Sequence, residues 1–216
     1  MPRSQTQIAS NSTREKIKAA AAEEFIDRGF DGSRMQAIAD RAGANKAMIY
    51  YYFHSKEALF EAIVRETFEE LFGLFSEIKP EREVDPETLI PRIVHIHTRF
   101  LFEHPHLPKM MVRELHAGHP IVEKVLKELF ANLKRGRYGE FLKVFEAAAK
   151  ARKIRRVDPQ QTMWNIVALN IFYFVAKPFL SAGWPEVFNE KSENEILNQR
   201  EKSVADLLLY GLSPRK

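Results

Sequence analysis

Polar and aromatic side chains that could contact nucleic acid are concentrated between positions 45 and 56. Asn45 and Lys46 open this run, three consecutive tyrosines occupy positions 50–52, and Lys56 follows them. Amide, phenol and ammonium groups donate hydrogen bonds to phosphate oxygens, and some of them also reach base edges. The residue types therefore indicate a surface that contacts DNA.

Two short helices joined by a tight turn are the elements that would position these side chains. Ala39, Gly43 and Ile49 are spaced four and then six residues apart. A small residue at Ala39 allows the helices to cross closely, and Gly43 supplies the positive φ of the turn. Ile49, with Phe53 four residues later, anchors the second helix inward. The spacing predicts a helix-turn-helix over roughly Ser33 to Phe53.

The helix before this motif is delimited by residues that cap helices. Ser12 and Glu15 have the spacing of a capping box, so the first helix is predicted to start near Ser12. Gly29 is predicted to end this helix through a left-handed cap, and Phe30 to pack back into the same core.

Capping residues also delimit the next three helices. Ser33 and Gln36 have the spacing of a second capping box, and Asn45 is a good N-cap for the third helix. Ser55 is predicted to cap a long fourth helix that runs to about Ile78.

Side chains that point away from the helix core are the candidate DNA contacts. Ala47 and Met48 can contact thymine methyl groups, and Tyr51 can reach a base or a phosphate. Free N–H groups at the predicted helix starts, near Thr13 and Ser33, are suited to phosphate. The candidate DNA-binding residues are Thr13, Ser33, Gln36, Asn45, Lys46, Ala47, Met48, Tyr50, Tyr51, Tyr52 and Lys56.

Helical periodicity dominates the rest of the chain and strand signals are nearly absent, which predicts an all-α fold. We expect an N-terminal three-helix helix-turn-helix DNA-binding domain over residues 1–56 and a C-terminal helical bundle over residues 57–216. A linker is expected over Lys79–Pro86 and a loop over Ser181–Asn194. The helices expected between and after them are Glu87–Glu103, Leu107–Ala117, Ile121–Ala151, Pro159–Leu180 and Glu193–Leu212.

Several classes of protein are disfavoured by the residue content. The chain has no Cys, which excludes disulfides, cysteine zinc sites and cysteine nucleophiles. It also has no Gly-rich phosphate loop or paired catalytic set, so neither an enzyme nor a cofactor is expected. His95 and His97 diverge on a helix because they are two residues apart, so no metal site is expected.

Charge and hydropathy favour a cytoplasmic protein that binds a polyanion. The first 56 residues hold nine Lys and Arg against six Asp and Glu, an excess that suits nucleic acid. The N-terminus lacks the apolar core of a signal peptide. The most apolar stretch, Met163–Leu180, contains Asn165, Asn170 and Lys177, and is too polar and too short for a membrane span.

Residues 13–64 closely resemble the DNA-binding domain of the TetR family of bacterial regulators. The family pattern of Tyr-x-x-Phe followed by Lys-Glu-x-Leu occurs at Tyr50–Phe53 and Lys56–Leu59. Ala47 stands where Gly is usual, Asn45 where Ser is common, and Tyr51 at a variable position, so the operator sequence cannot be carried over. The matching residues are Thr13–Arg14–Glu15, Ala20–Ala21, Phe25, Arg28–Gly29–Phe30, Ile38–Ala39 and, most densely, AGANKAMIYYYFHSKEAL at 42–59.

The resemblance implies a homodimer that binds a double-stranded DNA operator, with a C-terminal domain for ligand binding and dimerisation. The last two long helices are then expected to pair with their copies. The helix over Thr162–Leu180 is apolar nearly all round, as a helix buried on several faces must be. The alternative is that both helices are ordinary core helices of a monomer.

Aromatic and Met side chains with a few polar groups are the candidate lining of a ligand pocket, although an aromatic stripe at helical spacing is more often core. The expected function is a repressor that a hydrophobic small-molecule effector releases from its operator. The alternative is a DNA-binding dimer with no effector. The candidate ligand-binding residues are His97, Phe100, Met110, Met111, Glu114, Phe141, Phe145, Asn170 and Tyr173.

Overall fold

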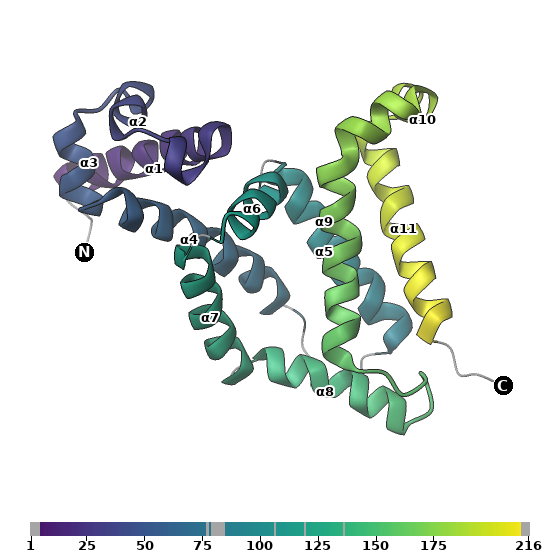
Figure 1. Cartoon of the computed structure of the whole chain (residues 1–216). Coiled ribbons are helices and arrows are strands. Elements are labelled where there is room, and N and C mark those ends of the chain that lie inside the picture. Colours follow the sequence, from purple (N-terminus) through teal and green to yellow (C-terminus); the bar gives the residue numbers. More distant parts are fainter. Residues whose placement is uncertain are drawn as a thin grey trace. The chain divides into compact units, whose positions relative to one another are not determined.

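The structure is a computed structural model of the whole chain, and it describes residues 5–76, 78, 85–105, 107–118, 120–135 and 137–212. The elements formed by these residues are eleven α-helices with no strand among them, which confirms the all-α prediction (Figure 1). They form two compact units. The first unit holds residues 1–69 and 109–129, and the second holds residues 70–108 and 130–216. The predicted domain boundary at residue 56 stays a prediction.

Four helices open the chain and supply most of the first unit: α1 (Gln5–Gly32), α2 (Met35–Ala42), α3 (Lys46–Phe53) and α4 (Lys56–Ser76). The helix α4 continues into the second unit after Glu69. Apolar residues recur on one face of each helix because the helical repeat brings positions three and four apart together. The fully buried ones include Ile17, Ala21, Phe25, Ile38, Ala39, Ile49, Leu59, Phe60 and Val64.

The start of α1 differs from the prediction. The helix begins at Gln5, so Ser12 and Thr13 lie inside it and the predicted capping box is wrong. Glu15 instead forms an ion pair with Lys18, with Glu15 Oε2 2.8 Å from Lys18 Nζ, as residues three apart on a helix can. At the other end, Gly29 breaks the helix where expected, but its φ of 75° and ψ of 173° are not those of the predicted left-handed cap, because ψ there is far from that of a left-handed helix.

Three phenylalanine rings fill the centre of the first unit. Phe25 and Phe60 meet edge to face with ring centroids 4.9 Å apart, and Phe30 lies 5.1 Å from Phe60. This geometry suits the aromatic quadrupole. Phe30 is buried, which confirms that it packs back into the core of the preceding helix.

Two later helices complete the first unit. Most of α6 (Leu107–His116) and α7 (Pro120–Arg135) belongs to it, although both helices also have residues in the second unit. Arg65 of α4 bridges Glu61 at 2.9 Å and Glu128 at 2.6 Å, and Lys124 contacts Glu61 at 3.0 Å. Hydrogen bonds from Arg65 and Lys124 lower the pKa of Glu61.

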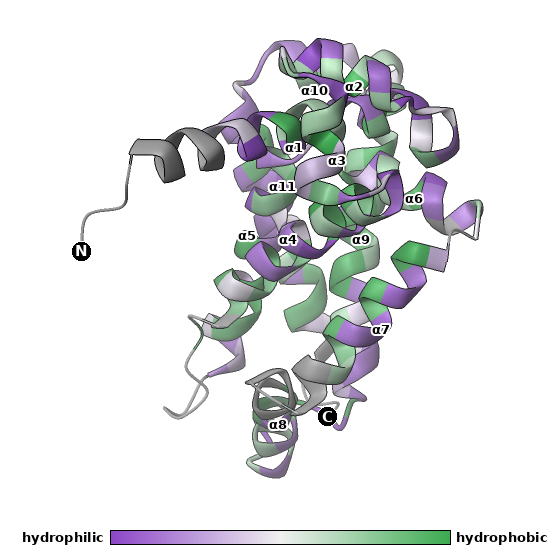
Figure 2. Ribbon diagram, turned by 90° about the vertical axis from the view of Figure 1, so that its left-hand side faces the viewer, coloured by the Kyte–Doolittle hydropathy of each residue, from purple (hydrophilic) through white to green (hydrophobic). Residues whose placement is uncertain are grey.

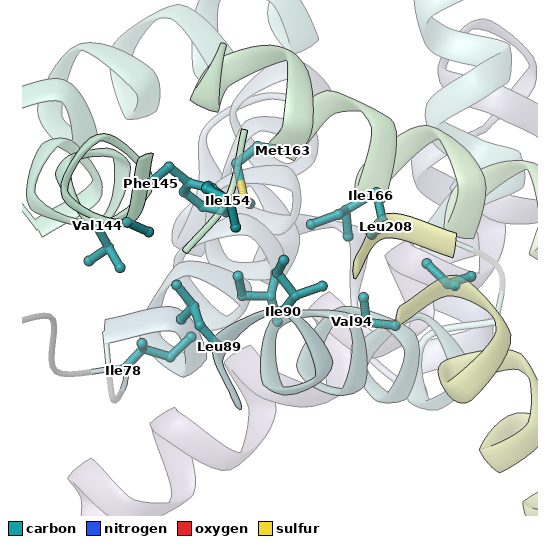
Figure 3. Packing of buried hydrophobic residues seen from close by; sticks show 13 residues of the cluster. Ile78, Leu89, Ile90, Val94, Val144, Phe145, Ile154, Met163, Ile166 and Leu208 are labelled. Carbon is teal, nitrogen blue, oxygen red and sulfur yellow. The ribbon is translucent and has the colours of Figure 1, made fainter. Parts of the chain in front are cut away.

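The second unit is built from α5 (Pro86–Glu103), α8 (Arg137–Lys150), α9 (Pro159–Gly183), α10 (Pro185–Asn189) and α11 (Glu193–Leu212). One core gathers side chains of α5, α8, α9 and α11, including Ile90, Phe145 and Ile166 (Figure 3). A second core contains Phe100, Leu101, Phe174 and Leu197.

Two predicted elements of the later chain were wrong. The single helix expected over Ile121–Ala151 is two helices, since α7 ends at Arg135 and α8 begins at Arg137. The loop expected over Ser181–Asn194 contains the last turn of α9 and all of α10. Pro185 is the first residue of α10, a position where a helix does not need the N–H that proline lacks.

The helix α9 has two apolar faces. Met163, Ile166 and Phe174 are buried within the second unit, whereas Trp164 and Phe172 are exposed. Hydrophobic residues run along much of this helix, as the green ribbon of Figure 2 shows. By length and composition alone, this one helix of the described residues could cross a membrane, which differs from the prediction, but core helices of soluble proteins pass the same test.

Candidate nucleic-acid interface

The turn between α2 and α3 is closed by a glycine. Gly43 has φ 60° and ψ 33°, the left-handed conformation that a side chain would strain. The N–H of Gly43 donates to the Asp40 carbonyl at 3.2 Å, and that of Ala44 donates to the Ala39 carbonyl at 3.0 Å. This pair of bonds is a Schellman motif and satisfies the last carbonyls of α2. The predicted turn is confirmed.

Helix α3 begins at its predicted cap. Asn45 is in extended conformation, and its Oδ1 accepts a hydrogen bond from the Ala47 N–H at 2.9 Å. Ile49 and Phe53 are buried, as their spacing of four predicted. The cap and the two anchors fix both the start of α3 and the direction in which its other side chains point.

The outward face of α3 carries the predicted contact residues. Tyr51 is 76% exposed, Tyr50 42% and Met48 37%, and Lys46 and Ala47 are also exposed. The tyrosine rings and the thioether side chain of Met48 can make apolar contacts, and the phenol and ammonium groups can donate hydrogen bonds. Tyr52 is half-buried, with its ring 5.1 Å from that of Tyr51 in an edge-to-face arrangement.

The start of α2 corrects one prediction. Ser33 is buried and its hydroxyl donates to the carbonyls of Glu24 and Gly29, so it does not cap α2. Gln36 donates to Asp40 at 2.8 Å, and the predicted capping box is wrong. Arg34 takes the N-cap position and is exposed, so it is a further basic candidate for a contact with DNA. It was not predicted because Ser33 and Gln36 have the spacing of a capping box.

The junction of α3 and α4 is strained and then capped. His54 has φ 65° and ψ −41°, and the Ser55 N–H reaches back to the Phe53 carbonyl at 2.7 Å, which makes a γ-turn. Ser55 Oγ then accepts from the Ala58 N–H at 3.1 Å, as an N-cap does. Lys56 lies half-buried, with Nζ 4.6 Å from the centre of the Phe30 ring.

A buried polar pair lies in the second unit. His97 of α5 and Asn170 of α9 are both buried, and Asn170 Nδ2 lies 3.2 Å from His97 Nδ1. Burial lowers the pKa of His97 to about 4, so the imidazole is neutral at pH 7. Two of the predicted ligand-binding residues are thus brought into contact.

Polar atoms with no hydrogen-bond partner among the described residues occur on three helices of the second unit. They are Thr98 Oγ1 on α5, Asn170 Oδ1 and Tyr173 Oη on α9, and Arg200 Nε on α11. The Arg200 guanidinium lies 5.0 Å from the Tyr173 ring, and burial raises the pKa of the Tyr173 phenol. Buried unpartnered polar atoms are costly and call for an explanation in each structure.

The remaining candidate ligand residues are divided between the two units. Phe100 and Phe145 are buried in the two cores of the second unit. Met110, Met111 and Glu114 are buried in the first unit, where the Glu114 carboxylate accepts a hydrogen bond from the Phe30 N–H. The side chain of Phe141 lies outside the described residues. Across the described chain, no three His, Asp or Glu side chains are grouped as a metal site requires.

Similarity to known proteins agrees with this geometry. Residues 17–63, which run from within α1 to within α4, match the family described as bacterial regulatory proteins, tetR family. The chain is 28% identical over 209 residues to the HTH-type transcriptional regulator RutR of Escherichia coli, covering 96% of this chain and 93% of RutR. It is 32% identical over 113 residues, about half of each chain, to the HTH-type transcriptional repressor NicS of Pseudomonas putida.

Solved structures share the fold over nearly the whole chain. A tetR-family bacterial regulatory protein from Rhodococcus superposes with a TM-score of 0.70 at 17% identity, covering 94% of this chain and 98% of that one. The structural similarity therefore extends through both units, and the match to the family covers the helix-turn-helix. The chain belongs to the TetR family, whose members are helix-turn-helix DNA-binding transcriptional regulators and not enzymes.

Proposed function

We propose that this regulator is a cytoplasmic repressor that binds its operator as a homodimer and is released by a small hydrophobic effector. The exposed face of α3 supports sequence-specific binding most directly. Ala47, Met48 and Tyr51 face outward there, while Ile49 and Phe53 hold the helix to the core. A short helix held in this way can enter the major groove with its N-terminal residues against base edges.

The base and phosphate contacts can be separated by substitution. Tyr51→Ala is expected to relax sequence preference at one base pair by about 1–3 kcal/mol. Lys56→Ala is expected to weaken binding to every sequence and to lower the slope of log affinity against log salt by about one. Binding is measured with duplexes selected by the wild-type protein from random sequence. Tyr51→Phe separates the ring from the hydroxyl, and the reverse assignment of the two effects would contradict the proposed roles.

Dimerisation through α9 and α11 is supported by their exposed apolar side chains. Phe172 is 71% exposed, and Trp164, Leu207 and Tyr210 are also exposed. A groove of about 950 Å³ on these helices is lined in part by Phe172, Leu180 and Leu207. Exposed apolar side chains gathered at a groove are typical of an interaction site, and a two-fold dimer also matches paired operator half-sites.

Sedimentation of matched variants tests the dimer. Phe172→Asp places a charge on the exposed face of α9 and is expected to produce monomers at concentrations where the wild type is dimeric. Val112→Asp is the control because Val112 is also an exposed apolar residue, but it lies on α6. Equal association of both variants and the wild type would exclude α9 as the interface.

An effector site in the second unit is supported by the polar groups among its apolar cores. His97 and Asn170 form a neutral buried pair, and Asn170 Oδ1 and Tyr173 Oη have no partner within the described residues. An apolar lining with a few polar groups is typical of small-molecule sites. We propose that the ligand acts through α4, which begins in the first unit and ends in the second, and thereby changes the half-site spacing.

A dimer without an effector is the competing function, and ligand binding distinguishes the two. Mass spectrometry of the purified protein would identify a co-purified molecule, and thermal shift with hydrophobic compounds would detect others. Asn170→Leu is expected to abolish the stabilisation by a true effector. An effector that stabilises the protein but leaves the operator footprint unchanged at saturation would contradict the release mechanism.

A further inference from the structure

At the break in α1 around Gly29, two backbone groups of this helix bond to side chains of another helix. In an uninterrupted helix the Phe30 N–H would donate to the Ile26 carbonyl four residues earlier. Gly29 has φ 75° and ψ 173°, a conformation that is essentially restricted to glycine, and the chain turns away there. The donor and the acceptor of that helical bond here both bond to side chains of α6.

Two consecutive residues of α6 supply those partners. The Phe30 N–H donates to Glu114 Oε1 at 3.2 Å, and Arg113 Nη1 donates to the Ile26 carbonyl at 3.1 Å. Arg113 Nη2 also donates to the Phe25 carbonyl. The end of α1 is thus completed by a carboxylate and a guanidinium that are 84 to 88 residues away in the sequence.

Burial and space show that this contact is closely fitted. Glu114 is 3% exposed, and its Oε1 lies 3.3 Å from Arg113 Nε, so the two charges compensate each other. A Cβ at position 29 would lie 3.1 Å from Arg113 Nε. A buried carboxylate is stable only when it is paired and hydrogen-bonded, as it is here.

The same turn leads directly into α2 and α3, called here the reading helices because they form the helix-turn-helix. The Ser33 hydroxyl donates to the carbonyls of Glu24 and Gly29, which fixes the chain immediately before α2. We propose that Arg113 and Glu114 are positioning residues for DNA binding, which hold the end of α1 and through it the placement of α2 and α3.

Arg113→Lys tests the proposal in the full-length protein. Lysine keeps the positive charge, but one ammonium cannot hold two carbonyls and a carboxylate in the planar fork of arginine. We expect about tenfold weaker binding to a duplex selected by the wild type, with an unchanged salt dependence. Lys109→Ala, an exposed residue of the same helix, is the control and should bind as the wild type does.

A pair of substitutions at Glu114 separates positioning from general destabilisation. Glu114→Gln keeps an acceptor for the Phe30 N–H and should retain affinity within about threefold, whereas Glu114→Leu should lose about tenfold. Amide exchange at Phe30 should accelerate in Glu114→Leu only, measured well below the melting temperatures of both variants.

Two results would overturn the proposal. Wild-type affinity in both Arg113→Lys and Glu114→Leu would show that the contact does not position the reading helices. A reduced salt slope in Arg113→Lys would instead identify Arg113 as a direct phosphate contact. If Arg113→Lys does not fold, the Glu114 pair decides the question.

Discussion

Acidification provides a quantitative test of the buried His97. Burial lowers its pKa to about 4 in the folded protein, whereas an unfolded histidine titrates near 6.5. Between these values the unfolded chain binds a proton that the folded chain does not. The free energy of unfolding is therefore fully retained above pH 6.5 and falls as the pH decreases towards 4. At pH 4.5 the predicted loss from this one residue is about 2.5 kcal/mol.

The assay compares urea unfolding of the wild type and His97→Gln from pH 7.5 to 4.5 at one protein concentration, because dimers unfold in a concentration-dependent way. Glutamine can still accept a hydrogen bond from Asn170 Nδ2 but does not titrate. Between pH 7.5 and 4.5, the free energy of unfolding of His97→Gln should decrease by about 2.5 kcal/mol less than that of the wild type. His116→Gln, at an exposed position, should follow the wild type. Parallel curves for the wild type and His97→Gln would refute the assignment of a buried neutral imidazole.

Three further substitutions test the local geometry by thermal or urea unfolding. Gly29→Ala should destabilise by about 2 kcal/mol or more because of its positive φ and the close Arg113 side chain, whereas Gly32→Ala should not, since its φ is not positive. Asn45→Ala should cost about 1 kcal/mol through loss of the cap on α3, and Asn45→Ser should restore most of it. Ser33→Ala should cost about 1–3 kcal/mol because the buried carbonyls of Glu24 and Gly29 lose the one hydroxyl donor that they share, and no change would show that the hydroxyl bonds are unimportant.

The parts of the fold that could be predicted from sequence are those that depend on neighbouring residues. Gly43 and Asn45 act within two to five positions of their own place, and Ile49 and Phe53 share a face by helical repeat. Such local rules are sufficient to place the turn, the start of α3 and its exposed face. The contact roles of individual residues on that face remain proposals.

Errors arose where a distant partner or a continuing helix overrode a local pattern. Ser12 had the spacing of a cap, but α1 extends upstream of it to Gln5. Ser33 had the same spacing, but its hydroxyl bonds to carbonyls of the preceding helix. Glu114 was grouped with the aromatic residues of a ligand pocket, and its bond to the Phe30 N–H crosses 84 residues. No periodicity encodes a contact of that range.

The completion of the first unit by residues 109–129 has a consequence for synthesis on the ribosome. The helix-turn-helix leaves the ribosome early, but Ile26 and Phe30 have their α6 partners only after Arg113 and Glu114 have been translated. At translation rates of about 5–20 residues per second, this delay lasts roughly 4–17 s. During that interval the nascent DNA-reading segment has an unfinished end to α1. In a chimera that exchanges only residues 1–69 between family members, the groups that bond to Ile26 and Phe30 would have to come from residues 109–129 of the other protein.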